Sequence, residues 1–277
     1  MQWTKVVRED IRGADAPLVY WSVTGHNLNL HAMFTTRAGG ASSGPWGELN
    51  LGASVGDDPS CVTENRRRLL SALPAGAPHA VQTVHQVHGT RWIEVGQPTG
   101  EQVLEGWWLG PRADAMIARC PRAFLAISVA DCLPIYIVDP EGQAVGLGHA
   151  GWRGLTSGLI DRLLSGMAAS WGTRPERCLA FLGPAIERRA FEVDRPVLDA
   201  LRDWVPWWRE VAYPSRAGRA RVDLAGAARK YLVTRGIPGE QILDPPGGTF
   251  YSDQFYSHRR DGGVTGRCCA LLWMGRS

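Results

Sequence analysis

The sequence contains 277 residues, of which 44% are hydrophobic and 21% charged, as is usual for a soluble globular protein with one large domain or two small ones. The net charge is only +3 and the arginines are scattered, so we expect no surface for non-specific nucleic-acid binding. Lysine occurs only as Lys5 and Lys230, which leaves almost no candidate for Schiff-base chemistry.

The first third of the chain is predicted to form two strands, a loop and a helix. Residues 18–24 and 28–36 have the pattern of strands around a turn at Gly25-His26-Asn27. Residues 37–56 are rich in glycine, and a loop of this length suggests a function, because long structureless loops are uncommon in compact domains. A helix is predicted over residues 59–73, because it would begin with proline directly after an aspartate N-cap.

Residues 80–95 are predicted to form one long strand. Side chains alternate between the two faces of a strand, so His88 would share a face with Gln86 and lie opposite His85. We therefore take His88 as the better candidate for a metal ligand and expect His85 to pack or to face solvent.

Three further strands are predicted, over residues 123–129, 133–138 and 144–148. The segment Ala130-Asp131-Cys132 separates the first two, and His149 closes the third. After His149, apolar residues recur at helical spacing and predict a helix. Arg153 would then lie at a strand-to-helix turn, where free backbone N–H groups and the helix dipole favour an anion.

The last part of the chain is predicted to contain two capped helices, a loop and a strand. The helices begin at Asp194 and Asp223, and the second ends near Gly236. Residues 255–266 form a glycine-flanked loop that carries Arg260, and residues 268–274 form the last strand. Because strands occur along the whole length without an obvious linker, we expect a single α/β or α+β domain over residues 1–277.

The first ten residues lack the apolar run of a secretory signal, and no apolar stretch is long enough to span a bilayer. The six cysteines include no C-x-x-C pair, which fits neither a small disulfide scaffold nor a zinc ribbon. We therefore expect a cytoplasmic protein with reduced thiols and no membrane partner.

A thiol and two imidazoles stand at the ends of strand-like runs, as Cys132, His88 and His149. These are zinc ligands, and three protein ligands rather than four are typical of a catalytic site with an open position. Asp131 is the nearest candidate in the sequence for an acid–base helper. Arg153, with Arg37 or Arg260 from the loops, could supply positive charge for an anionic substrate, and Asn50 is a further candidate contact.

Eight segments in order resemble the laccase-domain family, also called multicopper polyphenol oxidase or YfiH-like proteins. They are residues 35–40, 49–52, 56–66, 86–89, 130–132, 149–154, 183–186 and 259–267. The chain departs from the family at Gly248-Thr249, where Cys-Thr is frequent, at Arg188 and Arg189, where cysteines are frequent, and at His258, where tyrosine is frequent.

The resemblance implies a layered α+β fold, with mixed β-sheets flanked by helices. It implies that His88, Cys132 and His149 bind Zn²⁺, and that these residues take part in catalysis. It also implies purine nucleoside phosphorylase activity on a nucleoside and phosphate, with adenosine deamination and methylthioadenosine phosphorolysis as related activities.

Three other functions are weighed against this one. A copper oxidase needs a histidine-rich trinuclear cluster, whereas this chain has seven histidines and no H-x-H pair, so copper oxidation would come from adventitious Cu²⁺ in the zinc site. A cysteine hydrolase would use Cys132 as nucleophile and His149 or His88 as base. A structural zinc protein would need a fourth ligand, and none is evident.

Overall fold

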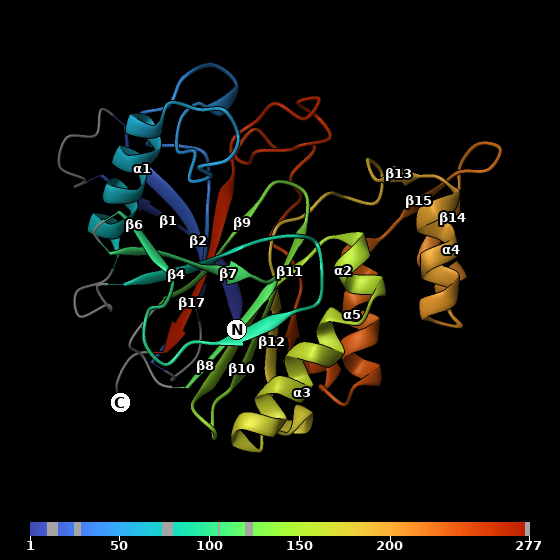
Figure 1. Cartoon of the computed structure of the whole chain (residues 1–277). Coiled ribbons are helices and arrows are strands. Elements are labelled where there is room, and N and C mark those ends of the chain that lie inside the picture. Colours follow the sequence, from blue (N-terminus) through green and yellow to red (C-terminus); the bar gives the residue numbers. More distant parts are fainter. Residues whose placement is uncertain (10–15, 25–28, 74–79, 105, 120–123, 275–277) are drawn as a thin grey trace.

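The computed structural model describes the chain except for residues 10–15, 25–28, 74–79, 105, 120–123 and 275–277 (Figure 1). The predicted turn at Gly25-His26-Asn27 lies outside the described residues, and so does Ala123, the first residue of a predicted strand.

The larger of two extended sheets has eight strands in the order β1-β2-β3-β17-β9-β4-β7-β6. Its strands are β1 (Gln2–Arg8), β2 (Leu18–Thr24), β3 (Leu30–Thr35), β17 (Cys268–Met274), β9 (Phe124–Val129), β4 (Val81–His85), β7 (Trp107–Arg112) and β6 (Glu101–Leu104). Most neighbours are antiparallel, but β4 is parallel to both β7 and β9. The sheet is therefore mixed, and the last strand of the chain lies at its centre.

The second sheet has six strands in the order β16-β12-β10-β11-β8-β5. They are β16 (Ile242–Leu243), β12 (Leu179–Leu182), β10 (Leu133–Asp139), β11 (Ala144–Ala150), β8 (Ala115–Arg119) and β5 (Trp92–Glu94). A small third sheet joins β13 (Glu192–Val193), β15 (Ala220–Val222) and β14 (Ala212–Pro214).

One core of the protein lies between the two extended sheets. Phe34, Ile127 and Leu272 of the first sheet and Tyr136 and Leu147 of the second belong to one buried apolar cluster. The Tyr136 hydroxyl donates a hydrogen bond to the Met33 carbonyl oxygen, at 2.7 Å, and so satisfies its polar group inside this core. This shared core supports our proposal that residues 1–277 form one domain.

Helices cover the outer faces of the two extended sheets, while α4 (Arg195–Trp204) lies beside the small third sheet (Figure 1). The other helices are α1 (Pro59–Ala72), α2 (Trp152–Thr156), α3 (Leu159–Trp171) and α5 (Leu224–Thr234). Leu69 of α1 packs in a cluster with strand residues of the eight-stranded sheet, while Leu163 and Met167 of α3 pack with those of the six-stranded sheet. The predicted α+β fold, with mixed sheets flanked by helices, is confirmed. Within the described residues, no helix is both long and apolar enough to cross a membrane.

Most of the predicted elements are confirmed, with small shifts of their ends. Asp58 caps α1 through the Ser60 N–H, and Asp223 caps α5 through the Gly226 N–H. Asp194 precedes α4, but its side chain makes no capping hydrogen bond. The helix predicted after His149 is interrupted, because Gly158 adopts a left-handed conformation with φ of 91° between α2 and α3.

The long strand predicted over residues 80–95 is wrong. Strand β4 ends at His85, and the chain then crosses from the eight-stranded to the six-stranded sheet, where it resumes as β5 at Trp92. His88 lies in the crossing loop with φ of 59°, so strand alternation does not decide which way it points. The N–H groups of residues 87–89 bind a carboxylate instead of a neighbouring strand.

Candidate metal centre

His88, Cys132 and His149 lie together at one end of the two extended sheets. The chain passes from the first sheet to the second at His88, between β4 and β5, and again at Cys132, between β9 and β10. His149 belongs to β11, where it pairs with Pro134 of β10. One candidate ligand atom from each of the three side chains lies within 4.8 Å of the others. The two imidazole rings meet edge to face, with centroids 4.9 Å apart.

The turn that carries Cys132 has a strained backbone. Asp131 has φ of 82°, a left-handed conformation that is uncommon for a residue with a side chain. Its carboxylate accepts hydrogen bonds from the Thr249 hydroxyl at 2.5 Å and from the Arg259 backbone N–H at 2.7 Å. Its carbonyl oxygen accepts one from the Ile186 N–H at 3.0 Å. These contacts hold the turn, and both carboxylate oxygens of Asp131 are engaged in them.

Asp114 is a buried residue of the centre that the sequence analysis missed. It lies directly before β8, and its side chain is fully buried. Its carboxylate faces the His149 ring, with 3.0 Å between Asp114 Oδ1 and His149 Nδ1. The same carboxylate accepts hydrogen bonds from the N–H groups of Val87, His88 and Gly89.

The three candidate ligands influence one another electrostatically. Burial raises the pKa of the Cys132 thiol, but the charge of His149 and hydrogen bonds from both imidazoles outweigh it and lower that pKa to about 6. Burial lowers the pKa of His149, but the Cys132 charge and the Asp114 carboxylate raise it to about 9. Near pH 7 and without a metal, these pKa values favour a thiolate at Cys132 and an imidazolium at His149.

The donor set fits a metal ion. A thiolate and two imidazoles suit zinc, and three protein donors leave a coordination position for another molecule. Within the described residues, this is the one group of three or more His, Cys, Asp or Glu side chains placed to hold a metal.

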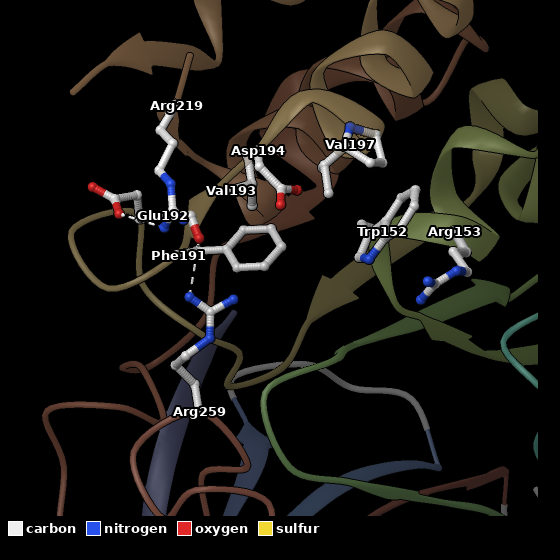
Figure 2. A pocket seen from close by; sticks show the side chains of 10 residues that line it. Trp152, Arg153, Phe191, Glu192, Val193, Asp194, Val197, Arg219 and Arg259 are labelled. Carbon is white, nitrogen blue, oxygen red and sulfur yellow. Dashed lines mark hydrogen bonds and ion pairs between the residues drawn. The ribbon is translucent and has the colours of Figure 1, made fainter. Parts of the chain in front are cut away.

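A cavity of about 430 Å³ lies next to the segments that carry the centre, although none of the three candidate ligands lines it (Figure 2). Trp152 and Arg153 form one wall and follow Gly151, which packs against the Cys132 sulfur. Phe191 and Arg259 lie across from them in Figure 2, and the backbone of Arg259 also binds Asp131. Its remaining wall comes from Glu192, Val193, Asp194, Pro196, Val197 and Arg219.

Arg153 is the predicted substrate contact that the structure leaves accessible. Its side chain is exposed, stacks on the Trp152 ring at 4.3 Å and, within the described part of the chain, makes no hydrogen bond or ion pair. The helix that begins beside it, α2, has only five residues. A strong helix dipole is therefore not available for an anion there, and the argument for anion binding rests on the guanidinium itself.

The other predicted substrate contacts are engaged inside the protein. Asn50 is fully buried, donates to Gly52 O and Asp57 Oδ2, and accepts from the Gly52 and Arg267 N–H groups. The Arg260 guanidinium binds the Asp261 carboxylate and several backbone carbonyl oxygens. Arg37 donates from Nε to Gly47 O at 2.6 Å and stacks on Tyr256. These contacts favour a role in organising the loops.

Arg267 is a second residue that the sequence analysis did not assign to the site. It is partly buried, and its Nη1 donates to the carbonyl oxygens of Thr265 and Gly266. Burial lowers the pKa of its guanidinium, and the negative charges of Cys132 and Asp131 act in the opposite direction. Arg267 thus places a positive charge close to the candidate ligands. Arg267 belongs to residues 259–267, a segment that resembles the family, and this resemblance was the one sequence signal that could have assigned Arg267 to the site.

The chain matches known proteins over most of its length. The profile of the family described as multi-copper polyphenol oxidoreductase laccase matches residues 31–275. A protein of Deinococcus radiodurans named purine nucleoside phosphorylase is 38% identical over 255 residues, which cover 90% of this chain and 91% of that protein. The Escherichia coli purine nucleoside phosphorylase YfiH is 37% identical over 244 residues, which cover 88% of this chain and 93% of that protein.

Solved structures match the fold as well. YlmD from Geobacillus stearothermophilus superposes with a TM-score of 0.83 and 31% identity, over 99% of this chain and 100% of that one. Bacillus licheniformis YfiH, described as a hypothetical protein, gives a TM-score of 0.82 and 31% identity, over 88% of this chain and 92% of that one. The chain therefore belongs to the multi-copper polyphenol oxidoreductase laccase family, the group of YfiH and YlmD.

Proposed function

We propose that this protein is a zinc-dependent purine nucleoside phosphorylase. It would convert adenosine or inosine and phosphate into the free base and ribose 1-phosphate, with adenosine deaminase and methylthioadenosine phosphorylase as side activities. The observation that carries the proposal is the set of His88, Cys132 and His149, together with a cavity of about 430 Å³ whose wall residues Trp152 and Arg153 directly follow Gly151, which packs against the Cys132 sulfur. The names of relatives at 37–38% identity support the same reaction.

Phosphorolysis forms a bond between a phosphate oxygen and C1′ of the ribose while the bond from C1′ to the purine N9 breaks. The electron pair of the broken bond leaves with the base. Zinc held by the three ligands would supply a Lewis acid for the negative charge that develops. The protein must also hold phosphate against the sugar, because correct positioning supplies a large part of such a rate enhancement.

The cavity offers groups for these tasks. We propose that the exposed Arg153 guanidinium holds the phosphate, because a charge-assisted contact suits an anion. Trp152 and Phe191 are aromatic residues of the cavity wall, and their rings can pack against a purine. For Asp131 we propose a positioning role rather than proton transfer, because Thr249 and Arg259 already bind both of its carboxylate oxygens.

A specific observation favours one alternative, a cysteine hydrolase. The lowered pKa of Cys132, about 6, and the raised pKa of His149, about 9, describe a thiolate–imidazolium pair of the kind that activates catalytic cysteines.

A copper oxidase is disfavoured, because the described residues offer a single three-residue cluster and a laccase needs several copper sites.

The test is a product assay by chromatography with zinc-loaded protein, with and without phosphate, for the wild type and for Cys132→Ala. We expect adenine and ribose 1-phosphate from adenosine with phosphate, and inosine as the product without it. The variant should form neither. If nucleosides stay untouched while an ester or peptide is cleaved by metal-free protein, the hydrolase alternative is correct.

A further inference from the structure

We infer that Asp114 is a positioning residue that sets the metal affinity of the centre by holding two of its three ligands at once. The inference rests on the proposed metal site, but not on the reaction that the site performs. Asp114 orients His149 through its ring and His88 through its backbone.

Asp114 and His149 are linked by both their side chains and their backbones. Asp114 Oδ1 lies 3.0 Å from His149 Nδ1, and the His149 N–H donates to the Asp114 carbonyl oxygen at 2.7 Å. A carboxylate only accepts hydrogen bonds, so the Nδ1 atom must carry the proton. The Nε2 lone pair is then the one left for a metal. A metal-binding histidine is commonly fixed in this way by a carboxylate.

The same carboxylate organises the loop of His88. It accepts from three consecutive amides, with Oδ1 2.9 Å from His88 N and Oδ2 2.7 Å from Gly89 N, while Val87 N lies 3.2 Å from both oxygens. His88 itself has the left-handed φ of 59°. A non-glycine residue keeps such a conformation where surrounding contacts enforce it, and here the carboxylate provides those contacts.

The sheet fixes where Asp114 stands. It directly precedes β8, whose Ala115 pairs with Gly148 of β11, the neighbour of His149. The Asp114 N–H donates to the Arg91 carbonyl oxygen at 2.9 Å, beside the end of the His88 loop. Its side chain is fully buried and does not line the cavity, so it serves the ligands rather than a substrate.

Asparagine tests this role because it keeps the shape of aspartate but replaces one acceptor oxygen by an NH₂ donor. In Asp114→Asn, a donor would face either the His88 N–H and the His149 ring or the Gly89 N–H. Loss of such a partner typically lowers metal affinity 10- to 100-fold. We expect a fall in this range in the zinc affinity of the variant, measured by competition with a chromophoric chelator.

Asp139→Asn is the matched control. Asp139 is also a fully buried aspartate of the six-stranded sheet, at the end of β10 remote from Cys132, and it binds the Gly142 N–H and Arg177. We expect this variant to melt at a lower temperature and to bind zinc with unchanged affinity. If Asp114→Asn lowers the melting temperature equally and leaves the zinc affinity unchanged, the inference is overturned.

A second measurement needs no variant. In zinc-loaded wild-type protein labelled with ¹⁵N, the imidazole spectrum should show His149 protonated at Nδ1 and bound to zinc through Nε2. Binding through Nδ1 would overturn the inference even if Asp114→Asn does not fold. A wild type that binds no zinc removes the site and the inference together, whereas zinc binding without nucleoside turnover affects only the proposed reaction.

Discussion

Gly151 packs so closely against Cys132 that a β-carbon at Gly151 would lie 3.1 Å from the Cys132 sulfur. The same atom would lie 3.1 Å from Cδ2 of His88. The φ of Gly151 is −68°, which any residue can adopt, so it is space and not backbone conformation that requires glycine here. The first residue after β11 is therefore part of the packing around the candidate ligands.

Gly151→Ala is expected to weaken zinc binding about tenfold, because the added methyl must push two ligands apart, and overpacking typically costs about 1–3 kcal/mol. Chelator competition measures this change. The control is Gly148→Ala, three residues earlier in β11, where the new β-carbon would meet Leu159 and Leu163 at 3.5 Å, an ordinary contact distance. Equal zinc affinities in the two variants would show that the contact with Cys132 is not restrictive.

The strands β9, β10 and β11 could be predicted from the sequence, and so could the positions of Cys132 and His149 at their ends, because both depend on local patterns. Apolar runs interrupted at Asp131 and closed at His149 mark β9, β10 and β11 directly in the sequence. The position of His88 could not be predicted in this way. Its surroundings favour a strand by composition, but the Asp114 carboxylate binds the amides that a strand would use.

Asp114 itself has no local signal. It lies 26 residues from His88 and 35 from His149, and only the pairing of β8 with β11 brings the three together. Gly248, where the sequence departs from the family, is also determined by a distant segment. A β-carbon at this position would lie 1.9 Å from the Glu187 side chain, so there is no space for a larger residue. Contacts between distant segments decide such positions, and periodicity within one segment does not report them.

Cys132→Ala is expected to lose zinc while keeping the fold, because it removes the thiolate donor from a partly exposed turn. Metal content is measured by atomic absorption and the fold by circular dichroism. Cys178→Ala is the control, since Cys178 is a buried thiol of the apolar core and is remote from the three candidate ligands. Full zinc retention in Cys132→Ala would refute the assignment of Cys132 as a ligand.

Removal of zinc is expected to make Cys132 reactive at neutral pH. Its pKa of about 6 is below the usual value, so the thiolate is present above pH 6 and is lost as the pH falls through that value. Alkylation with iodoacetamide should therefore rise up to about pH 7 and then level off. Burial raises the pKa of Cys178 and of Cys268 to about 12, so both should stay unmodified at pH 7.

The alkylated residues are identified by peptide mapping, and the same reaction is run with zinc-loaded protein. A thiolate that binds zinc should be protected there. If Cys132 reacts equally fast with and without zinc, it is a free thiol in both states, as the cysteine-hydrolase alternative requires.

Arg153→Ala is expected to raise the KM for phosphate by about 10- to 100-fold, because a charge-assisted hydrogen bond contributes roughly 1.5–3 kcal/mol. The melting temperature should not change, since Arg153 is exposed and its one described side-chain contact is the stacking on Trp152. Arg162→Ala is the control, an exposed arginine of the neighbouring helix α3 that does not line the cavity. Initial rates at varied phosphate and fixed adenosine give the KM. Deamination without phosphate should proceed at the wild-type rate in both variants, and an equal loss of that rate in Arg153→Ala would show a general structural role instead of phosphate binding.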